Sequence, residues 1–246
     1  MEDIPNQVCG LAGDLSNLKI LDLGCGDMLA DVGLLGRAPK QITGLDVAFH
    51  EWDVVERAVR VVSEAGFPVP QDYASRMSYV PYNGTKFPFA DNQFDLIISW
   101  SAFEHIPQVR EVLDEMRRVV KPQGRAFVQV YPWFHCYWGS HLSDYIDEAY
   151  FHLRRPAEWV LAQLQNYVAA HPEQGDFILG HMWSEYRKLN RYSAQLFLRD
   201  AMDAGFSIER LESITRDVHT EEAPPEVPLA DVKVCGTLVL LNPAKR

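Results

Sequence analysis

Short apolar runs alternate with stretches of helical periodicity along the first half of the chain. Two segments, 51–66 and 107–120, repeat apolar residues every three or four positions, as an amphipathic helix does. We expect the first helix to end at Gly66, and the second to begin at Pro107 and end in the sequence KPQG. Five runs have the length of a buried strand: 19–24, 41–47, 77–82, 94–99 and 125–131. This alternation predicts a parallel sheet with crossover helices.

The alternation stops at residues 132–190, whose composition favours a mostly helical insertion rich in aromatic residues and histidine. Beyond it, Ser193 can cap a helix that ends at Gly205. Two apolar runs, 206–215 and 232–241, then predict closing strands that pair antiparallel. We expect one domain over residues 1–246, in which the insertion 132–190 forms part of a substrate pocket.

The composition excludes several classes of partner. The 246 residues carry a formal net charge of −11, which argues against binding to nucleic acid or to an anionic membrane surface. The N-terminal sequence MEDIPNQVCG lacks the apolar core of a signal peptide, and no run is long enough for a membrane helix. The four cysteines have no metal-site or disulfide spacing. These features predict a cytoplasmic protein with free thiols.

The stretch KILDLGCGDML, residues 19–29, has the pattern of a nucleotide-like cofactor site. Gly24 and Gly26 follow the first strand, where glycine lets the backbone approach a ligand closely. Asp46 ends the second strand, and its carboxylate can accept hydrogen bonds from both hydroxyls of a ribose. A dinucleotide site has the same elements, but Met28 and Leu29 occupy positions where small residues are usual. An NAD-type oxidoreductase therefore stays open at this point.

Two further stretches carry a family resemblance. The run FPFADNQFD leads into the fourth strand, and the sequence KPQG precedes the fifth. Together they resemble the class I S-adenosylmethionine-dependent methyltransferases, particularly the small-molecule branch with a type 11-like domain, over about 18–131 and 189–212. The resemblance implies a Rossmann-like, doubly wound α/β fold. Its mostly parallel, seven-stranded sheet would have an antiparallel last strand, with the helical insertion after strand five.

The resemblance also implies S-adenosylmethionine as the cofactor and assigns roles to individual residues. Asp22 would organise the first turn and orient the methionine amine, and Asp46 would hold the ribose hydroxyls. Asn83 stands where the family usually has aspartate, which predicts somewhat weaker binding. The other implied contacts are Gly24, Cys25 and Gly26 along methionine and ribose, Val47, Asn83 and Gly84 at adenine, and Ser99 with Trp100 near the methionine portion.

The expected reaction is in-line methyl transfer to a small-molecule or glycan acceptor, most simply a hydroxyl. His141, just after strand five, is the first candidate for a general base, and His105, just after strand four, is the second. His135, Asp144 and His152 have no recognised metal-ligand spacing with His141, so we expect no metal. The sequence also leaves open a methyltransferase-like binding module without catalysis. Oligomeric state is not predicted.

Overall fold

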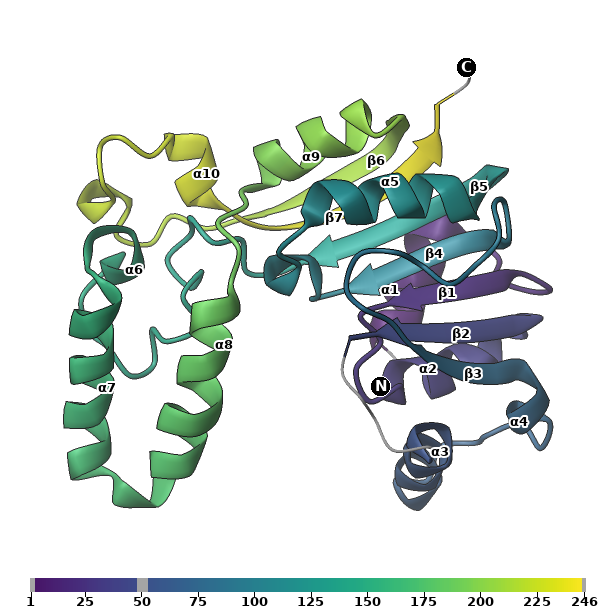
Figure 1. Cartoon of the computed structure of the whole chain (residues 1–246), viewed down its shortest axis with the longest axis horizontal. Helices are drawn as coiled ribbons and strands as arrows, with labels where there is room; N and C mark the ends of the chain where they lie inside the picture. The colour runs from purple at the N-terminus through teal and green to yellow at the C-terminus, as the bar shows by residue number, and fades with distance from the viewer. Residues whose placement is uncertain (1–2, 48–52, 245–246) are drawn as a thin grey trace.

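The computed structural model describes residues 3–47 and 53–244, and its centre is a seven-stranded sheet in the order β3-β2-β1-β4-β5-β7-β6 (Figure 1). Neighbouring strands are parallel except at β7, which runs antiparallel to both β5 and β6. The predicted α/β fold with an antiparallel last strand is therefore confirmed. The strands are β1 (Lys19–Leu23), β2 (Gln41–Asp46), β3 (Met77–Pro81), β4 (Phe94–Trp100), β5 (Val120–Val130), β6 (Phe206–Thr215) and β7 (Val234–Pro243).

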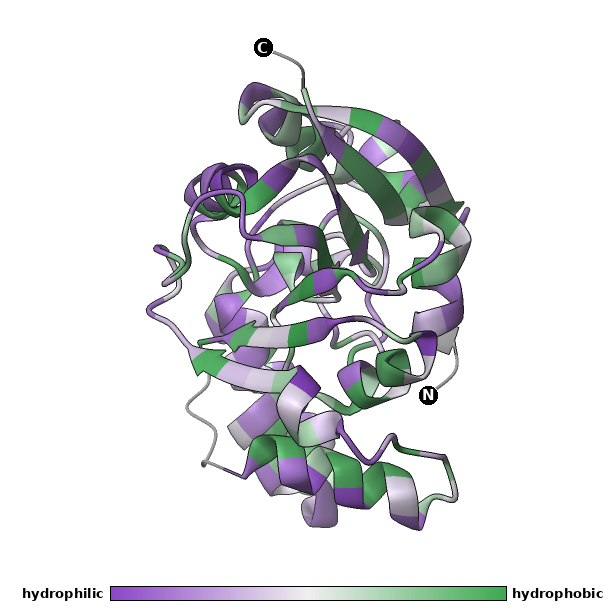
Figure 2. Ribbon diagram, turned by 90° about the vertical axis from the view of Figure 1, so that its right-hand side faces the viewer, coloured by the Kyte–Doolittle hydropathy of each residue, from purple (hydrophilic) through white to green (hydrophobic). Residues whose placement is uncertain are grey.

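Helices cover both faces of the sheet because the buried strands carry apolar residues on both sides. Along β1, Ile20 packs into one core and Leu21 into the other, as the two-residue period of a strand requires. In Figure 2 the helices carry hydrophobic and hydrophilic residues side by side along their length, as helices with one buried face do. One face is covered by α1 (Asp3–Ala12), α2 (Leu29–Leu34) and α3 (Val54–Glu64), the other by α5 (Val109–Val119) and α9 (Ala194–Asp203).

Some element boundaries differ from those predicted. The helix expected from Pro107 begins at Val109 and buries the predicted apolar face. It ends at Val119, and KPQG lies inside β5, because Val120 already pairs with Phe94 of β4. For the helix predicted over 51–66, residues 51 and 52 lie outside the described part, and α3 occupies Val54–Glu64. Helix α1 was not predicted, although its apolar side packs beneath the sheet.

The segment from 132 to 190, called the helical segment below, lies beyond the carboxyl ends of β4 and β5 (Figure 1). It has a hydrophobic core of its own, which includes Leu142, Phe151 and Leu164. Its elements are α6 (Phe151–Arg154), α7 (Ala157–Ala170), η3 (Pro172–Gln174), the π-helical η4 (Asp176–Met182) and α8 (Trp183–Lys188). The remaining elements of the chain are η1 (Leu35–Arg37), α4 (Tyr73–Arg76), η2 (Phe103–His105), η5 (Thr220–Glu222) and α10 (Leu229–Lys233).

Within the described ranges, no helix combines the length and apolar character that crossing a membrane would require. The four cysteines are free thiols.

Met28 occupies a position where a small residue is usual, and a glycine on the neighbouring strand leaves room for its side chain. It precedes α2 in the left-handed conformation, with φ 60°, and its side chain is fully buried. A Cβ atom at Gly44 of β2 would lie 2.6 Å from Cys25 Sγ and 2.9 Å from Met28 Cε. The glycine in β2 thus leaves the space that the Met28 and Cys25 side chains occupy.

We expect Gly44→Ala to lower the free energy of unfolding by about 1–3 kcal/mol, because the added methyl group overpacks this contact. Urea unfolding of the whole chain measures the change. The control is Gly10→Ala in α1, where a Cβ meets nothing within 4 Å. It should raise stability by about 0.5–1 kcal/mol, since alanine favours the helix. Equal stabilisation by both substitutions would contradict the crowding at Gly44.

Candidate functional site

The glycine turn after β1 is bound directly to the end of β2. The Gly24 N–H donates to the Leu45 carbonyl at 2.8 Å, and the Gly26 N–H donates to Asp46 Oδ2 at 2.9 Å. Both glycines have positive φ, 76° and 52°, a conformation that other residues rarely adopt. A Cβ atom at Gly24 would collide with that of Ala102, whereas one at Gly26 would meet nothing within 4 Å. The turn is therefore packed against the segment after β4 on one side and is open on the other.

Two buried carboxyl groups lie beneath this turn. Asp22 ends β1 and Asp31 lies in the first turn of α2, with exposed fractions of 5% and 0%. Asp22 Oδ1 and both Asp31 oxygens have no hydrogen-bond partner among the described residues. Burial raises the pKa of Asp22 to about 7, helped by the Asp46 carboxylate. Burial, with Asp22 nearby, also raises the pKa of Asp31 well above its usual range. The pair therefore retains at least one proton near neutral pH.

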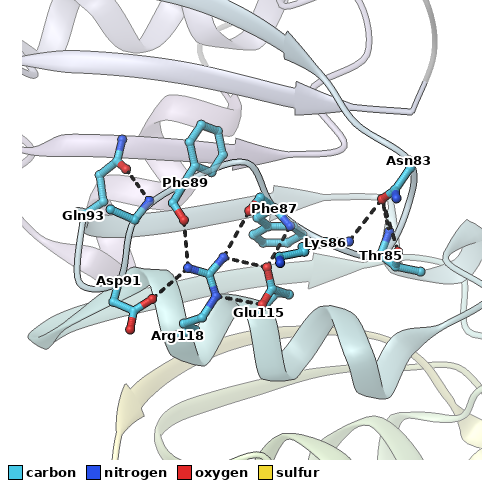
Figure 3. A network of polar contacts seen from close by, with 10 residues as sticks. Asn83, Thr85, Lys86, Phe87, Phe89, Asp91, Gln93, Glu115 and Arg118 are labelled. Atoms are coloured by element: carbon cyan, nitrogen blue, oxygen red, sulfur yellow. Dashed lines mark hydrogen bonds and ion pairs between the residues drawn. The ribbon is translucent and has the colours of Figure 1, made fainter.

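The residues that the family resemblance assigns to adenine lie just after β2 and β3. Val47 is 63% exposed, and a Cβ atom at Gly84 would lie 3.5 Å from Val47 Cγ1, so these two residues are adjacent. Asn83 Oδ1, however, accepts hydrogen bonds from Thr85 N and Lys86 N, each at 3.1 Å, and from Thr85 Oγ1 at 3.2 Å (Figure 3). A carbonyl oxygen has only two lone pairs, so this one is fully used in shaping the turn. A contact between Asn83 and adenine stays a prediction.

The loop that contains FPFADNQFD is tied to α5 through one arginine (Figure 3). Arg118 donates to the Phe89 carbonyl at 2.7 Å and to Asp91 Oδ1 at 2.8 Å, and it also pairs with Glu115. Glu115 Oε2 in turn accepts from the Phe87 N–H at 2.7 Å. These bonds fix the loop that delivers the chain to β4, which gives the motif a structural role beside any contact with a ligand.

At the end of β4, Ser99 and Trp100 turn toward the interior. Ser99 Oγ donates to the Leu23 carbonyl at 2.9 Å and so joins β4 to the start of the glycine turn. The Trp100 ring stacks on Phe127, with centroids 6.1 Å apart. Cys25 keeps its proton, because burial and the nearby Asp31 carboxyl group raise the pKa of its thiol. The structure thus gathers the predicted cofactor positions at adjacent strand ends, while their contacts with a cofactor stay predictions.

Both candidate bases lie in a second cluster, beyond β4 and β5. The rings of His105 and His141 have centroids 5.6 Å apart, although 36 positions separate them in the chain. His105 Nδ1 lies 3.8 Å from Glu185 Oε2 on α8, a residue that the sequence did not indicate. Glu104, beside His105, is 3% exposed. The cluster therefore joins three segments that are distant in sequence.

The histidine pair is uncharged near neutral pH. Burial, with a smaller contribution from His105, lowers the pKa of His141 to about 4. Burial lowers the pKa of His105 as well, and it raises the pKa of Glu104 to about 8. His141 can therefore accept a proton throughout the neutral range.

Two further histidines of the helical segment, His135 and His152, pack around Phe134. Both His135 and His152 pack edge-on against the ring of Phe134, and His152 Nε2 lies 2.9 Å from the Phe134 carbonyl. Burial lowers the pKa of His152 to about 4. These contacts give His152 a packing role in the helical segment.

The helical segment is anchored to the loop after β4 by one asparagine. The Asn190 side chain donates to the Phe103 carbonyl at 2.5 Å and to the Ile106 carbonyl at 2.7 Å. The Asn190 N–H donates to the Glu104 carbonyl at 2.9 Å. The position of Glu185 relative to His105 follows from this anchor, since only four residues separate Glu185 from Asn190 along the chain.

Comparison with known families matches residues 21–128 to the family model described as a methyltransferase domain. A demethylmenaquinone methyltransferase of Bacillus velezensis is 33% identical over 109 residues, which are 44% of this chain and 42% of that protein. A sterol 24-C-methyltransferase of Gibberella zeae is 29% identical over 116 residues, 47% of this chain and 28% of that protein. The chain thus spans less than half the length of these curated relatives.

Solved structures show the same fold over nearly the whole chain. An S-adenosylmethionine-dependent methyltransferase of Mesorhizobium loti has a TM-score of 0.55 at 18% identity, covering 93% of this chain and 92% of its own. The [4+2]-cyclase SpnF has a TM-score of 0.59 at 16% identity, covering 98% and 80%. At such low identity these likenesses establish the fold and no activity.

We expect Asp31→Asn to stabilise the chain increasingly as pH rises. In the folded state Asp31 holds its proton, whereas in the unfolded chain it ionises above a pKa of about 3.9. The folded state then binds more protons, so Asp31 contributes less stability as pH rises from about 4 through neutrality. Asparagine removes this loss, and the stability difference from the wild type should widen by about 1–3 kcal/mol between pH 5 and 7.

Urea unfolding at the two pH values measures this difference. The exposed Asp203→Asn on α9 is the control, whose difference from the wild type should stay constant. A constant difference for Asp31→Asn would show that Asp31 is ionised in the folded protein.

Proposed function

We propose that this chain, whose residues 21–128 match the methyltransferase-domain family model, is a class I, S-adenosylmethionine-dependent methyltransferase that transfers a methyl group to a small-molecule or glycan hydroxyl. The observation that carries the proposal is the glycine turn held by Asp46 over two buried carboxyl groups, Asp22 and Asp31. The proposed acceptor follows from the neutral histidine pair beyond β4 and β5.

The residues at the turn fit the chemistry of this cofactor. S-adenosylmethionine bears a sulfonium and an ammonium group, and the buried Asp22 Oδ1 has no hydrogen-bond partner among the described residues. Carboxylates are the natural partners of such cations. Asp46 can accept from ribose hydroxyls while its Oδ2 holds the Gly26 N–H, since a carboxylate offers about four lone-pair sites. When bound, the cofactor supplies a methyl group that is already activated by the positive sulfur.

The other contacts are proposed by position. Gly24, Cys25 and Gly26 would lie along the methionine and ribose, with the backbone of Ser99 and Trp100 near the methionine portion. Val47 and Gly84, which are adjacent, would contact adenine. Asn83 would reach the adenine edge through its amide nitrogen, because its oxygen is used in the turn.

The protein's main contribution to the rate is alignment of the acceptor with the methyl group, which can supply up to about 7–11 kcal/mol. His141 accepts the hydroxyl proton at Nε2, an atom without a partner among the described residues. A general base contributes about 10²–10⁴-fold. With a pKa of about 4, His141 is a weak base, so we place its contribution near the lower limit. His105 is the second candidate, and Glu185 lies close enough to stabilise its cation.

The helical segment is proposed to form the wall of the acceptor pocket that faces the strand ends. Many of its aromatic residues serve packing. Trp133 belongs to the core of the sheet, Tyr150 packs with Val232 of α10, and Trp159 and Trp183 pack against the segment's own core. We therefore expect the choice of acceptor to depend on the residues around His141 more than on the many aromatic residues of the helical segment. The names of the sterol and menaquinone relatives support a small-molecule acceptor.

A second candidate is a protein of this fold that does not transfer methyl groups. The use of the Asn83 oxygen within its own turn favours it, since that oxygen is then not available to accept from the adenine amino group. The likeness to a cyclase is a further reason to test activity and binding separately.

Calorimetric titration with S-adenosylmethionine tests the cofactor site. We expect Asp46→Ala to weaken binding about 10–100-fold or more, since a hydrogen bond to a charged group contributes about 1.5–3 kcal/mol. Asp46→Asn retains an acceptor for the Gly26 N–H and should also weaken binding, because the amide oxygen cannot serve the turn and both hydroxyls. The exposed Glu64→Ala on α3 is the control. Absence of binding by the wild type would refute the proposed function.

Transfer of a labelled methyl group to hydroxylated acceptors tests the base. We expect His141→Ala to lower kcat about 10²-fold at unchanged cofactor affinity. The wild-type rate should be flat from pH 6 to 8, since a base with a pKa of about 4 is already neutral there. His171→Ala, at the end of α7, is the matched control. Full activity of His141→Ala would remove this histidine from the reaction.

A further inference from the structure

The cluster beyond β4 and β5 contains three buried polar atoms that have no hydrogen-bond partner among the described residues. They are Glu104 Oε2, His105 Nδ1 and His141 Nε2. The same three residues each offer a ligand atom, and these atoms all lie within 4.8 Å of one another. Buried polar atoms nearly always have a hydrogen-bond partner, so three such atoms on residues whose ligand atoms also lie close together indicate a ligand.

We propose that Glu104, His105 and His141 form a binding site for a divalent transition-metal ion of the zinc class. Two imidazoles and one carboxylate favour Zn²⁺ or Co²⁺, whereas Mg²⁺ and Ca²⁺ require mainly oxygen ligands. Bonds of about 2.0–2.2 Å place neighbouring ligand atoms roughly 3–3.5 Å apart, so modest side-chain rotations close the site. Three protein ligands leave a position for water, or for the Glu185 carboxylate, which lies 3.8 Å from His105 Nδ1.

The backbone holds the ligands in place before any ion binds. The Asn190 side chain fixes the carbonyls of Phe103 and Ile106 on either side of Glu104 and His105. The Asn190 N–H also binds the Glu104 carbonyl. His141 has φ 59°, an uncommon conformation for a residue with a side chain.

A second group in the described ranges, His219 with Glu221 and Glu222, has similar ligand types but lacks these features. All three side chains are exposed, and His219 Nδ1 already lies 3.1 Å from Glu222 Oε1. None of its atoms is a buried polar atom without a partner. It serves as the control site.

A metal ion at this cluster would interfere with the proposed methyl transfer. An ion at His141 takes the nitrogen lone pair that would otherwise accept the hydroxyl proton. Metal and substrate proton therefore compete for the same atom, and an ion of this class should inhibit methyl transfer wherever that transfer depends on His141.

Titration of the chelator-treated full chain with Co²⁺ tests the site directly, through the visible d–d absorption of the bound ion. We expect one Co²⁺ per chain, displaced by Zn²⁺. Glu104→Gln and His141→Ala should each weaken binding at least about tenfold, since even substitutions outside the ligand shell cost about 10–100-fold. His219→Ala should leave the affinity unchanged. Circular dichroism and S-adenosylmethionine titration of each variant verify that it is folded.

Absence of Co²⁺ binding would overturn the inference, as would binding that survives both ligand substitutions or that is lost only in His219→Ala. Binding of Co²⁺ by a chain that binds no S-adenosylmethionine would support the metal site and refute the proposed function. Binding of Co²⁺ with undiminished methyl transfer would support the metal site and refute the role of His141 as the base.

Discussion

The hydrogen bond from the Gly26 N–H to Asp46 Oδ2 is the contact on which the rest of the site depends. It joins the turn after β1 to the end of β2. Its formation requires positive φ at Gly26 and close packing of Gly24 on the segment after β4. Room beneath the turn comes from Gly44, which lets Met28 pack against β2. Met28 replaces the usual small residue in KILDLGCGDML, and Gly44 on the neighbouring strand provides the space for its side chain.

Sequence patterns predicted the sheet and the first half of the site because both depend on local periodicity. Apolar runs locate strands, and parallel strands bring their carboxyl ends to one edge, so Asp22, Gly24, Gly26 and Asp46 could be grouped without coordinates. Asp31 was not predicted, since an acid in the first turn of a helix is usually an exposed contributor to helix stability. Glu185 gave no signal at all, because its place beside His105 depends on how Asn190 anchors the helical segment.

The function of the aromatic residues in the helical segment could not be predicted from composition. Their density in sequence suits both a ligand pocket and a small separate core. The structure assigns many of them to the core, because a segment placed beyond the sheet edge must bury its own apolar surface to remain folded. Composition alone cannot separate these two uses, since both require the same side chains.

The charge of the turn separates the two cofactor classes that its glycines left open. A dinucleotide brings a pyrophosphate to this position, where backbone N–H groups and a helix N-terminus receive the anion. Here Asp22 and Asp31 are buried beneath the turn, and Asp46 occupies the Gly26 N–H. An anion would disfavour ionisation of these buried acids, whereas a nearby sulfonium or ammonium group would favour their charged form. The buried acids are therefore the feature of this turn that favours a cation over an anion.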